Sequence, residues 1–255
     1  MAGCYVRNFR WNYRWEGQRV ILRFDGVLFG YEVWLNGKYV GRWGSAYNLA
    51  QWDVTDKLVN GRNTIAVKVL TRSHAWLFDT NDCWALAGIF RSVELFTVPN
   101  DYVEDIVFRV DGIDFAAKDA KSAKVSIEVA VGAFEEAAAK TKKVYASLVD
   151  EDGMHALDFD LELKDGKAQG EGVVANAHLW SPEAPYLYDL VVTLVDAEGG
   201  KIERIVEKQG LKTVAVDGTR LLVNGNPTFL KGVAWNEIDP VLGRAITETE
   251  RRGQM

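Results

Sequence analysis

The chain has 255 residues, of which 48% are hydrophobic, 26% charged and 11% aromatic, a composition typical of a folded protein and not of a disordered one. The 30 Lys and Arg against 36 Asp and Glu give a formal net charge of −6, and no basic run with interleaved aromatic residues occurs, so nucleic acid is not an expected partner. No apolar stretch approaches the roughly 20 residues that span a bilayer, and the first residues form no signal peptide, so the sequence predicts a soluble protein without a membrane partner, cytoplasmic by default.

Short turn signals divide the chain into segments of strand length. Pairs of Gly with Asp, Asn or Gly accept the positive φ of tight hairpin turns. They recur at 25–26, 36–37, 60–61, 111–112, 152–153, 165–166, 199–200, 217–218 and 224–225. Between them apolar and polar residues alternate, which predicts strands with one buried face around 20–24, 31–35, 65–69, 125–131 and 190–194. The sequence therefore predicts an all-β chain, at least to about residue 225.

A break in composition near Pro99 predicts two β-sandwiches instead of one. Seven of the nine tryptophans precede this break, whereas residues 100–208 are rich in Val, Ala, Lys, Asp and Glu. Trp rings suit the apolar faces of sugars, but they also fill sandwich cores, and core packing is the default interpretation for most of them. A sugar-binding surface would instead require exposed rings at Trp34, Trp43, Trp76 and Trp84.

No metal site and no cofactor are predicted for this chain. The two cysteines form no C-x-x-C motif, and the three histidines are too widely spaced to form a pair of metal ligands. The run GEGVVA at 170–175 matches a dinucleotide-binding pattern only in its letters, because no helix follows it in this region of expected strands.

Three segments, in chain order, resemble one enzyme family. The first covers residues 20–95 and is most specific in four places, FDGV at 24–27, VWLNGKYVG at 33–41, DVTDKLVNGRNTIAV at 53–67 and NDCWALAGIFR at 81–91. The second is HLWSPEAPYLY at 178–188, and the third is GLKTVAVDGTRLLVNGNPTFLKGVAWNEIDP at 210–240. They resemble, respectively, the sugar-binding jelly roll, the immunoglobulin-like second domain and the entry into the (β/α)₈ barrel of glycoside hydrolase family 2. This family includes β-galactosidases, β-glucuronidases and β-mannosidases.

The resemblance implies three parts. Residues 1–98 would form a jelly roll that lacks its first strands, residues 99–209 an immunoglobulin-like β-sandwich, and residues 210–255 a linker and the first strand of a truncated barrel. Family members carry several tens of residues before the segment matched by Gly3 to Phe9, so a lost N-terminus could have carried a signal peptide to the periplasm or the exterior. A barrel needs about 250 residues, and only 20 follow Trp235.

Without the barrel, no catalytic residue is predicted in this chain. A retaining glycosidase uses an acid and a nucleophile about 5–5.5 Å apart, and the family carries both as glutamates on later barrel strands. Asp79 with Asp82, and Glu237 with Asp239, are the candidate substitute pairs. Neither has an evident apolar pocket to raise the pKa of one carboxyl, so hydrogen-bonding or solvated carboxylates are expected instead.

The resemblance offers Asp82, Asn81 and Glu237 as substrate-binding residues. Asp82 aligns with an aspartate that, in β-galactosidase-type members, bonds sugar hydroxyls in the barrel's active site and helps hold a monovalent cation. The parent enzyme is thus expected to use a monovalent or divalent cation. The alternative is an Asn81-Asp82 turn that bonds its own backbone. Glu237 matches the H-E-x-x-P motif of many members, but Asn236 and Ile238 replace positions that are often His, which weakens a galactose-specific interpretation.

Three hypotheses are open at this point. The first is an N-terminal fragment of a retaining β-glycosidase, inactive alone, whose parent hydrolyses terminal β-linked sugars. The second is a non-catalytic carbohydrate-binding module, and the third is a structural sandwich pair without a ligand. Residues 210–240 favour the first, because a free-standing module has no use for a barrel entry strand. The apolar segment 228–235 is expected to fold back on the second sandwich or to drive self-association.

Overall fold

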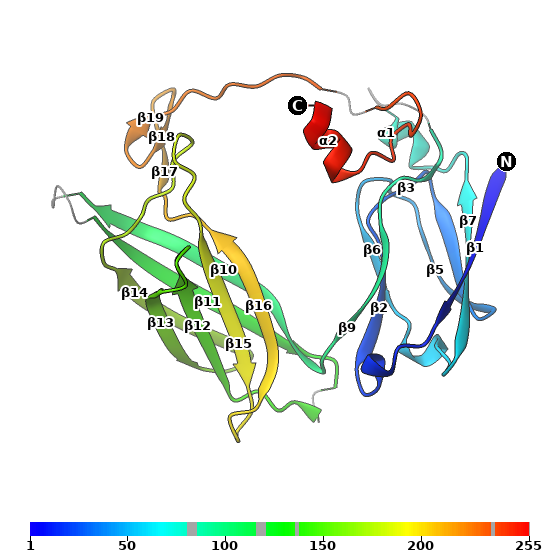
Figure 1. Cartoon of the computed structure of the whole chain (residues 1–255), viewed down its shortest axis with the longest axis horizontal. Helices are drawn as coiled ribbons and strands as arrows, with labels where there is room; N and C mark the ends of the chain where they lie inside the picture. The colour runs from blue at the N-terminus through cyan, green and yellow to red at the C-terminus, as the bar shows by residue number, and fades with distance from the viewer. Residues whose placement is uncertain (81–85, 116–120, 136–137, 236–237, 255) are drawn as a thin grey trace. The chain divides into compact units, whose positions relative to one another are not determined.

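A computed structural model describes residues 1–80, 86–115, 121–135, 138–235 and 238–254. They form two compact units, Met1–Val98 with Val233–Met255, and Pro99–Gly232. Both units consist mainly of antiparallel strands (Figure 1), which confirms the all-β prediction. Within these residues no helix has the length and hydropathy needed to cross a membrane.

In the first unit, two sheets enclose a core. One has the strand order β1-β7-β4-β5, the other has the order β6-β2-β9, and β3 pairs with β8. The strands are β1 (Ala2–Arg10), β2 (Arg19–Phe24), β3 (Val27–Leu28), β4 (Tyr31–Leu35), β5 (Lys38–Trp43), β6 (Ala50–Asp53), β7 (Arg62–Leu70), β8 (Gly88–Ile89) and β9 (Val93–Val98). The described helical segments are η1 (Tyr13–Trp15), η2 (Thr55–Lys57), α1 (Trp76–Asp79) and α2 (Glu248–Gln254).

The alternating residues of the sequence line this core as expected. Val20, Leu22 and Phe24 of β2 are at most 1% exposed, and they pack with buried residues of β4 and β7. The Asn36-Gly37 pair turns β4 into β5 with φ values of 51° and 77°, the positive values that a type I′ turn requires. Sequence alternation and turn chemistry therefore agree on the same hairpin.

Two asparagines explain part of the motif DVTDKLVNGRNTIAV. Asn63 is fully buried, and its Oδ1 accepts hydrogen bonds from Asn36 Nδ2 at 2.7 Å and from the Val59 backbone N at 2.9 Å. Asn36 Oδ1 in turn accepts from the Thr64 backbone N at 2.9 Å. A buried amide needs such partners, so these asparagines join the β4–β5 turn to the start of β7.

The second unit is also a two-sheet sandwich. One sheet has the order β10-β11-β14, and the other β13-β12-β15-β16. The strands are β10 (Asp101–Asp114), β11 (Ser122–Ala133), β12 (Lys143–Val149), β13 (His155–Glu162), β14 (Lys167–Val174), β15 (Tyr188–Val195) and β16 (Lys201–Gln209). A smaller sheet follows, formed by β17 (Val214–Asp217), β18 (Arg220–Val223) and β19 (Asn226–Pro227).

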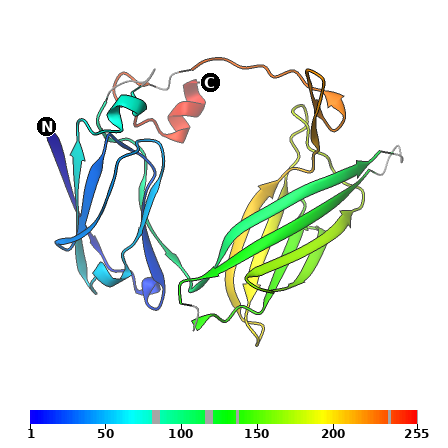
Figure 2. The ribbon, with the colours of Figure 1, turned by 180° about the vertical axis from the view of Figure 1, so that it is seen from behind.

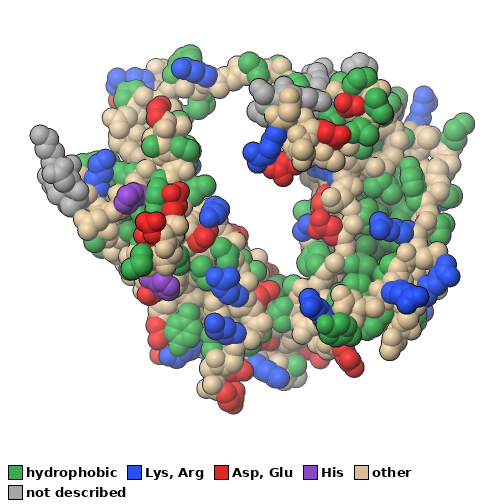
Figure 3. Space-filling view, in the orientation of Figure 1, with side chains coloured by type: hydrophobic (Ala, Val, Ile, Leu, Met, Phe, Trp, Pro, Cys, Tyr) green, Lys and Arg blue, Asp and Glu red, His purple; other side chains and the backbone are tan. Residues whose placement is uncertain are grey.

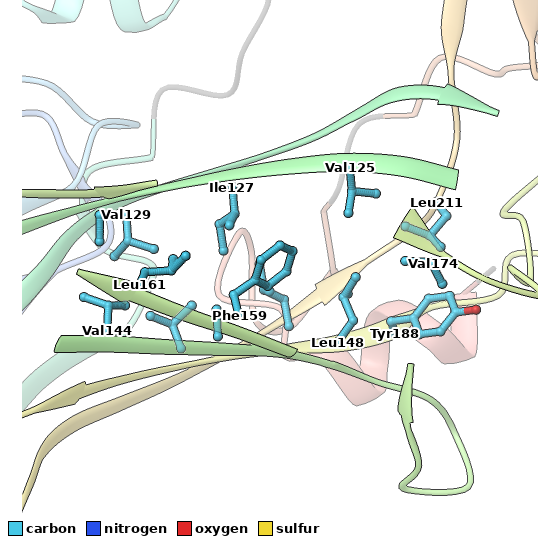
Figure 4. Close-up of a cluster of buried hydrophobic side chains, with 14 of the residues drawn as sticks. Val125, Ile127, Val129, Val144, Leu148, Phe159, Leu161, Val174, Tyr188 and Leu211 are labelled. Atoms are coloured by element: carbon cyan, nitrogen blue, oxygen red, sulfur yellow. The ribbon is translucent and has the colours of Figure 1, made fainter. Parts of the chain in front are cut away.

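Side chains from both sheets meet in the core of this unit. Figure 4 shows Val125, Ile127 and Val129 of β11 above Val144 and Leu148 of β12, with residues of β13 between the layers. The predicted strands at 125–131 and 190–194 are thus confirmed within β11 and β15.

The first five residues of the run GEGVVA, 170–174, lie in β14, as expected for a region of strands. A Cβ atom on Gly170 would lie 2.6 Å from Leu161 Cδ2, and one on Gly172 would lie 2.8 Å from Leu157 Cδ2. The two glycines therefore make room for side chains of β13, and this pattern serves packing.

The segment expected to be the first barrel strand is not a strand here. After β19 no secondary structure is assigned to residues 228–235, and Phe229, Leu230 and Val233 are 83%, 76% and 93% exposed. A barrel strand is held by backbone hydrogen bonds to parallel neighbours on both sides. Among the described residues, no strand pairing includes residues 228–235.

The surface carries charges of both signs. On the face shown in Figure 3, Lys and Arg side chains are interspersed with Asp and Glu and do not gather into one basic patch.

Candidate functional site

The candidate site lies at one end of the first sandwich, where the chain leaves β7 and returns at β8. Helix α1 occupies this end, and the segment that carries α2 lies beside it in both views (Figures 1 and 2). Asn81, Asp82 and Glu237 lie outside the described residues. The site is therefore built from the residues that flank them.

Asp79, two residues before Asn81, is held by two contacts with the 46–47 loop. Its Oδ2 accepts a hydrogen bond from the Ala46 backbone N at 3.0 Å, and its carbonyl oxygen accepts one from the Tyr47 hydroxyl at 3.2 Å. A carboxylate that caps a backbone N–H has a structural role. This contact gives Asp79 the hydrogen-bonding role expected from the sequence.

A small apolar cluster supports this loop. Leu28, Phe29 and Ala46 are at most 1% exposed, and Tyr47, Trp76 and Phe90 pack against them. The Arg72 guanidinium lies 4.9 Å from the Trp76 ring centroid. Trp76 is half-buried in this cluster, so packing accounts for it.

Two motifs of the sequence meet here. The Arg91 guanidinium lies 5.1 Å from the Phe90 ring centroid, and its Nη1 lies 3.4 Å from the carbonyl oxygens of Asp25 and Tyr47. A Cβ atom on Gly26 would lie 2.8 Å from Arg91 Cδ and 2.9 Å from Phe90. FDGV and the end of NDCWALAGIFR therefore contact each other directly, and the glycine is required by that contact.

After Glu237, the chain forms a tight turn at residues 239–243. Asp239 Oδ1 accepts hydrogen bonds from the backbone N–H groups of Val241 and Leu242 at 2.8 and 2.9 Å, and the backbones of Asp239 and Gly243 bond to each other at 2.8 and 2.9 Å. The N–H donors of Leu242 and Val241 hold the pKa of the Asp239 carboxyl below its ordinary value. A catalytic acid needs the opposite shift, so Asp239 serves the turn.

Trp34 and Trp43 differ in exposure and in their surroundings. Trp34 is half-buried against Tyr39, with ring centroids 5.7 Å apart. Trp43 is 39% exposed and borders a groove of about 360 Å³ lined also by Glu32, Arg42 and Lys68. Trp84 lies outside the described residues. Of the four tryptophans proposed as sugar platforms, Trp43 is therefore the exposed one in the described part of the chain.

Among the described residues, no group of three or more His, Cys, Asp or Glu side chains is arranged to hold a metal ion. Asp82, which the resemblance offers as a cation ligand, is not among those residues.

Comparison with known families identifies the two sandwiches. The sugar-binding domain of glycosyl hydrolases family 2 matches residues 1–99, and a second domain described as Glycosyl hydrolases family 2 matches residues 102–212. The chain belongs to glycosyl hydrolase family 2.

Family 2 relatives resemble this chain over nearly its full length. A β-galactosidase of Priestia megaterium is 32% identical over 249 residues, and one of Halalkalibacterium halodurans is 30% identical over 249 residues. These matches cover 96% and 98% of this chain but 24% of each relative, so the chain spans about a quarter of their length. A β-glucuronidase of Bifidobacterium dentium, solved in complex with coumarin-3-O-glucuronide, superposes with a TM-score of 0.86 at 27% identity and covers 98% of this chain and 46% of that one.

Two residues at this end of the first unit, Arg244 and Tyr47, were not predicted from the sequence. Arg244 Nη1 donates a hydrogen bond to the Tyr47 hydroxyl at 2.8 Å, across 197 positions of sequence. No periodicity or motif connects such distant residues.

Proposed function

We propose that this chain forms the N-terminal part of a retaining β-glycosidase that hydrolyses terminal β-linked sugars. The observation that carries the proposal is similarity that runs through both sandwiches and into the final segment, covering 96% to 98% of the chain in β-galactosidases and a β-glucuronidase. A sugar-binding module alone would explain similarity in the first sandwich only.

The proposed reaction needs a pair of carboxyl groups, and the two described candidates from the sequence, Asp79 and Asp239, have other roles. One protonates the leaving oxygen and the other attacks the anomeric carbon, at a separation of about 5–5.5 Å. Asp79 and Asp239 are already committed to backbone N–H groups. Because the chain spans 24% of its β-galactosidase relatives, the proposal assigns the catalytic glutamates to the remainder of a longer enzyme.

In this proposal Asn81, Asp82 and Glu237 contact the sugar. A carboxylate accepts hydrogen bonds from two adjacent hydroxyls, and an amide both donates and accepts. Support comes from their neighbours, because Asp79 and the 239–243 turn are both fixed by hydrogen bonds at the same end of the first unit. The alternative for Asp82, a turn that bonds its own backbone, predicts no loss of sugar affinity when the side chain is removed.

The sugar is proposed at the level of a terminal β-glycoside, because the curated relatives are β-galactosidases and the solved neighbours are β-glucuronidases. Aryl β-galactoside, aryl β-glucuronide and aryl β-mannoside should be offered separately to the protein read from the whole gene. We expect hydrolysis of at least one, with the anomeric configuration retained by proton NMR. Inversion of configuration, or no hydrolysis of any of the three, would refute the proposal.

One observation favours a second candidate, a carbohydrate-binding surface at Trp43. Its ring borders a groove whose polar side chains include the Lys68–Glu32 pair, with Nζ and Oε2 3.1 Å apart. An indole face beside charged groups is suited to a sugar. A single exposed ring, however, adds little area against the cost of association, about 4–15 kcal/mol.

We therefore expect weak or absent sugar binding by the 255-residue chain. Titration with galactose, mannose, glucuronate and an oligosaccharide, followed by Trp fluorescence, should show no saturation below about 1 mM. Trp43→Ala should leave this result unchanged, and Trp235→Ala, at the 43% exposed Trp235, serves as the matched control. Sub-millimolar binding lost only in Trp43→Ala would favour the binding module.

The exposed segment 228–235 should promote self-association. Phe229 and Leu230 are more than three-quarters exposed, and an apolar segment without strand partners is prone to pair with another copy. We expect the Phe229→Ser, Leu230→Ser double variant to lower the average mass measured by light scattering. Val216→Ser, at a 74% exposed position outside the segment, is the control. A wild-type chain that stays monomeric as its concentration rises would contradict this expectation.

A further inference from the structure

Arg244 occupies a specific place on the first sandwich. Its guanidinium carbon lies 5.5 Å from the Tyr47 ring centroid and 5.6 Å from the Phe90 ring centroid, and its Nη1 donates to the Tyr47 hydroxyl at 2.8 Å. The two rings are arranged edge to face, with centroids 6.1 Å apart. Arg244 is half-buried, so this cation contacts both rings and a hydrogen-bond acceptor at once.

Tyr47 connects this contact to the loop that contains α1. Its hydroxyl accepts from Arg244 and donates to the Asp79 carbonyl oxygen at 3.2 Å. A phenolic oxygen has one hydrogen to donate and lone pairs to accept, so both bonds can form together. Asp79 is also fixed by the Ala46 backbone N. Arg244, Tyr47 and Asp79 thus form one chain of contacts.

The same turn also lies near Leu86, which follows residues 81–85. A Cβ atom on Gly243 would lie 3.5 Å from Leu86 Cδ1, so the Leu86 side chain is next to the turn. The turn at 239–244 therefore lies near described residues that precede and follow residues 81–85, namely Asp79, which it reaches through Tyr47, and Leu86. It also begins two residues after Glu237.

We propose that Arg244 is a positioning residue for the glycosidase reaction. It holds the 239–244 turn against Tyr47 and so fixes that turn relative to the loop that contains α1. The inference rests on the proposed function for its catalytic consequence, but the contact itself can be tested separately. A planar guanidinium suits the site because it can stack on an aromatic ring while an N–H group points to the hydroxyl. A lysine ammonium has no planar face and would retain only part of this contact.

The contact is tested first in the 255-residue chain by amide hydrogen exchange. Arg244→Ala should increase exchange of residues 238–244 and 45–48 by about tenfold or more, because the turn then opens locally. Arg244→Lys should give a smaller increase. The matched control is Arg252→Ala, because Arg252 lies on α2, is 78% exposed and pairs with Glu248. Exchange in Arg244→Ala equal to that of wild type would overturn the inference whatever the activity of the enzyme.

The catalytic consequence is tested in the protein read from the whole gene. Arg244→Ala and Tyr47→Phe should each raise KM for the aryl glycoside and lower kcat/KM by about 10- to 100-fold, since small displacements of binding groups are costly. Arg244→Lys should restore part of the loss, and Arg252→Ala should match wild type. An active enzyme whose KM is unchanged in Arg244→Ala would refute the positioning role. An inactive wild-type enzyme would instead refute the proposed function.

Discussion

We expect the isolated 255-residue chain to hydrolyse aryl β-galactoside, β-glucuronide and β-mannoside no faster than buffer. Glycosidase rates depend on an acid and a nucleophile held in fixed geometry, and such positioning can supply about 7–11 kcal/mol of the barrier. In the described part of the chain, the two carboxylates first considered as substitutes, Asp79 and Asp239, are bound to backbone N–H groups. Release of the aryl group should therefore stay at the background rate.

This expectation is checked by a sensitive fluorogenic assay with purified chain. A family 2 β-galactosidase serves as the positive control under the same conditions. Turnover of any substrate that one substitution within residues 1–255 abolishes would show that the chain carries its own catalytic group. Turnover that survives every such substitution would point to a contaminating enzyme.

Replacement of Asp101 should cause a large loss of stability in the second unit. The side chain is buried, and its Oδ2 accepts hydrogen bonds from the backbone N atoms of Lys140 and Thr141 at 2.7 and 2.6 Å and from Thr141 Oγ1 at 2.7 Å. Asp101→Ala leaves these donors without a partner, and each buried unsatisfied group costs about 1–3 kcal/mol. We expect the free energy of unfolding of this unit to fall by about 3 kcal/mol.

The stability lost in Asp101→Ala should depend on pH. Burial opposes ionisation of Asp101, but hydrogen bonds from Thr141, Asn100 and Lys140 outweigh it, so the pKa of the carboxyl lies below its ordinary value. A lowered pKa means that the folded state favours the ionised form, so this stabilisation is complete above the unfolded-state pKa of about 3.9 and disappears as the pH falls through the folded-state value. The difference between wild type and Asp101→Ala should therefore shrink below about pH 4.

Urea unfolding followed by hydrogen exchange in β10 and β11 measures this difference at neutral and acidic pH. Asp111→Ala, at an exposed carboxylate on β10, is the matched control and should have little effect. An Asp101→Ala variant as stable as wild type at neutral pH, or equally destabilised at both pH values, would contradict the assigned role.

Local chemistry made much of the fold predictable. Alternation identified β2 and β4 because each strand has one face toward a sandwich core, where Val20, Leu22 and Val33 are at most 1% exposed. Glycine-containing pairs marked turns because tight turns require positive φ, which Gly and Asn adopt more readily than other residues. Asn224 and Gly225 have φ values of 51° and 74°. Such signals involve neighbouring residues only, so a single sequence carries them.

Long-range pairing was not predictable in the same way. Asp101 meets Thr141 across 40 positions, and Arg244 meets Tyr47 across 197. Neither contact has a local pattern, because it depends on where two loops arrive in the folded unit. The segment 228–235 failed as a strand for a related reason: its apolar residues favour a strand, but a strand also requires neighbours.

For the candidate site, the sequence predicts which loops contribute but not which contacts hold them. The resemblance directed attention to Asn81, Asp82 and Glu237, and the described residues around them are fixed by contacts of Asp79, Asp239 and the preceding motifs. The motif letters could not reveal why Gly26 is required, because its close neighbour Arg91 lies 65 positions later. The location of the site therefore remains a proposal from the motif resemblance, whereas the packing around Gly26 explains that glycine.

The central proposal, that this chain contributes sugar contacts to a family 2 β-glycosidase, is tested most directly by Asp82→Ala in the protein read from the whole gene. The measurement is kcat/KM for the better of the aryl β-galactoside and β-glucuronide substrates, with Asp111→Ala as the control. A hydrogen bond to a charged group contributes about 1.5–3 kcal/mol, so the proposal predicts a loss of about 10- to 100-fold in Asp82→Ala and none in the control. An Asp82→Ala enzyme as active as wild type would contradict it.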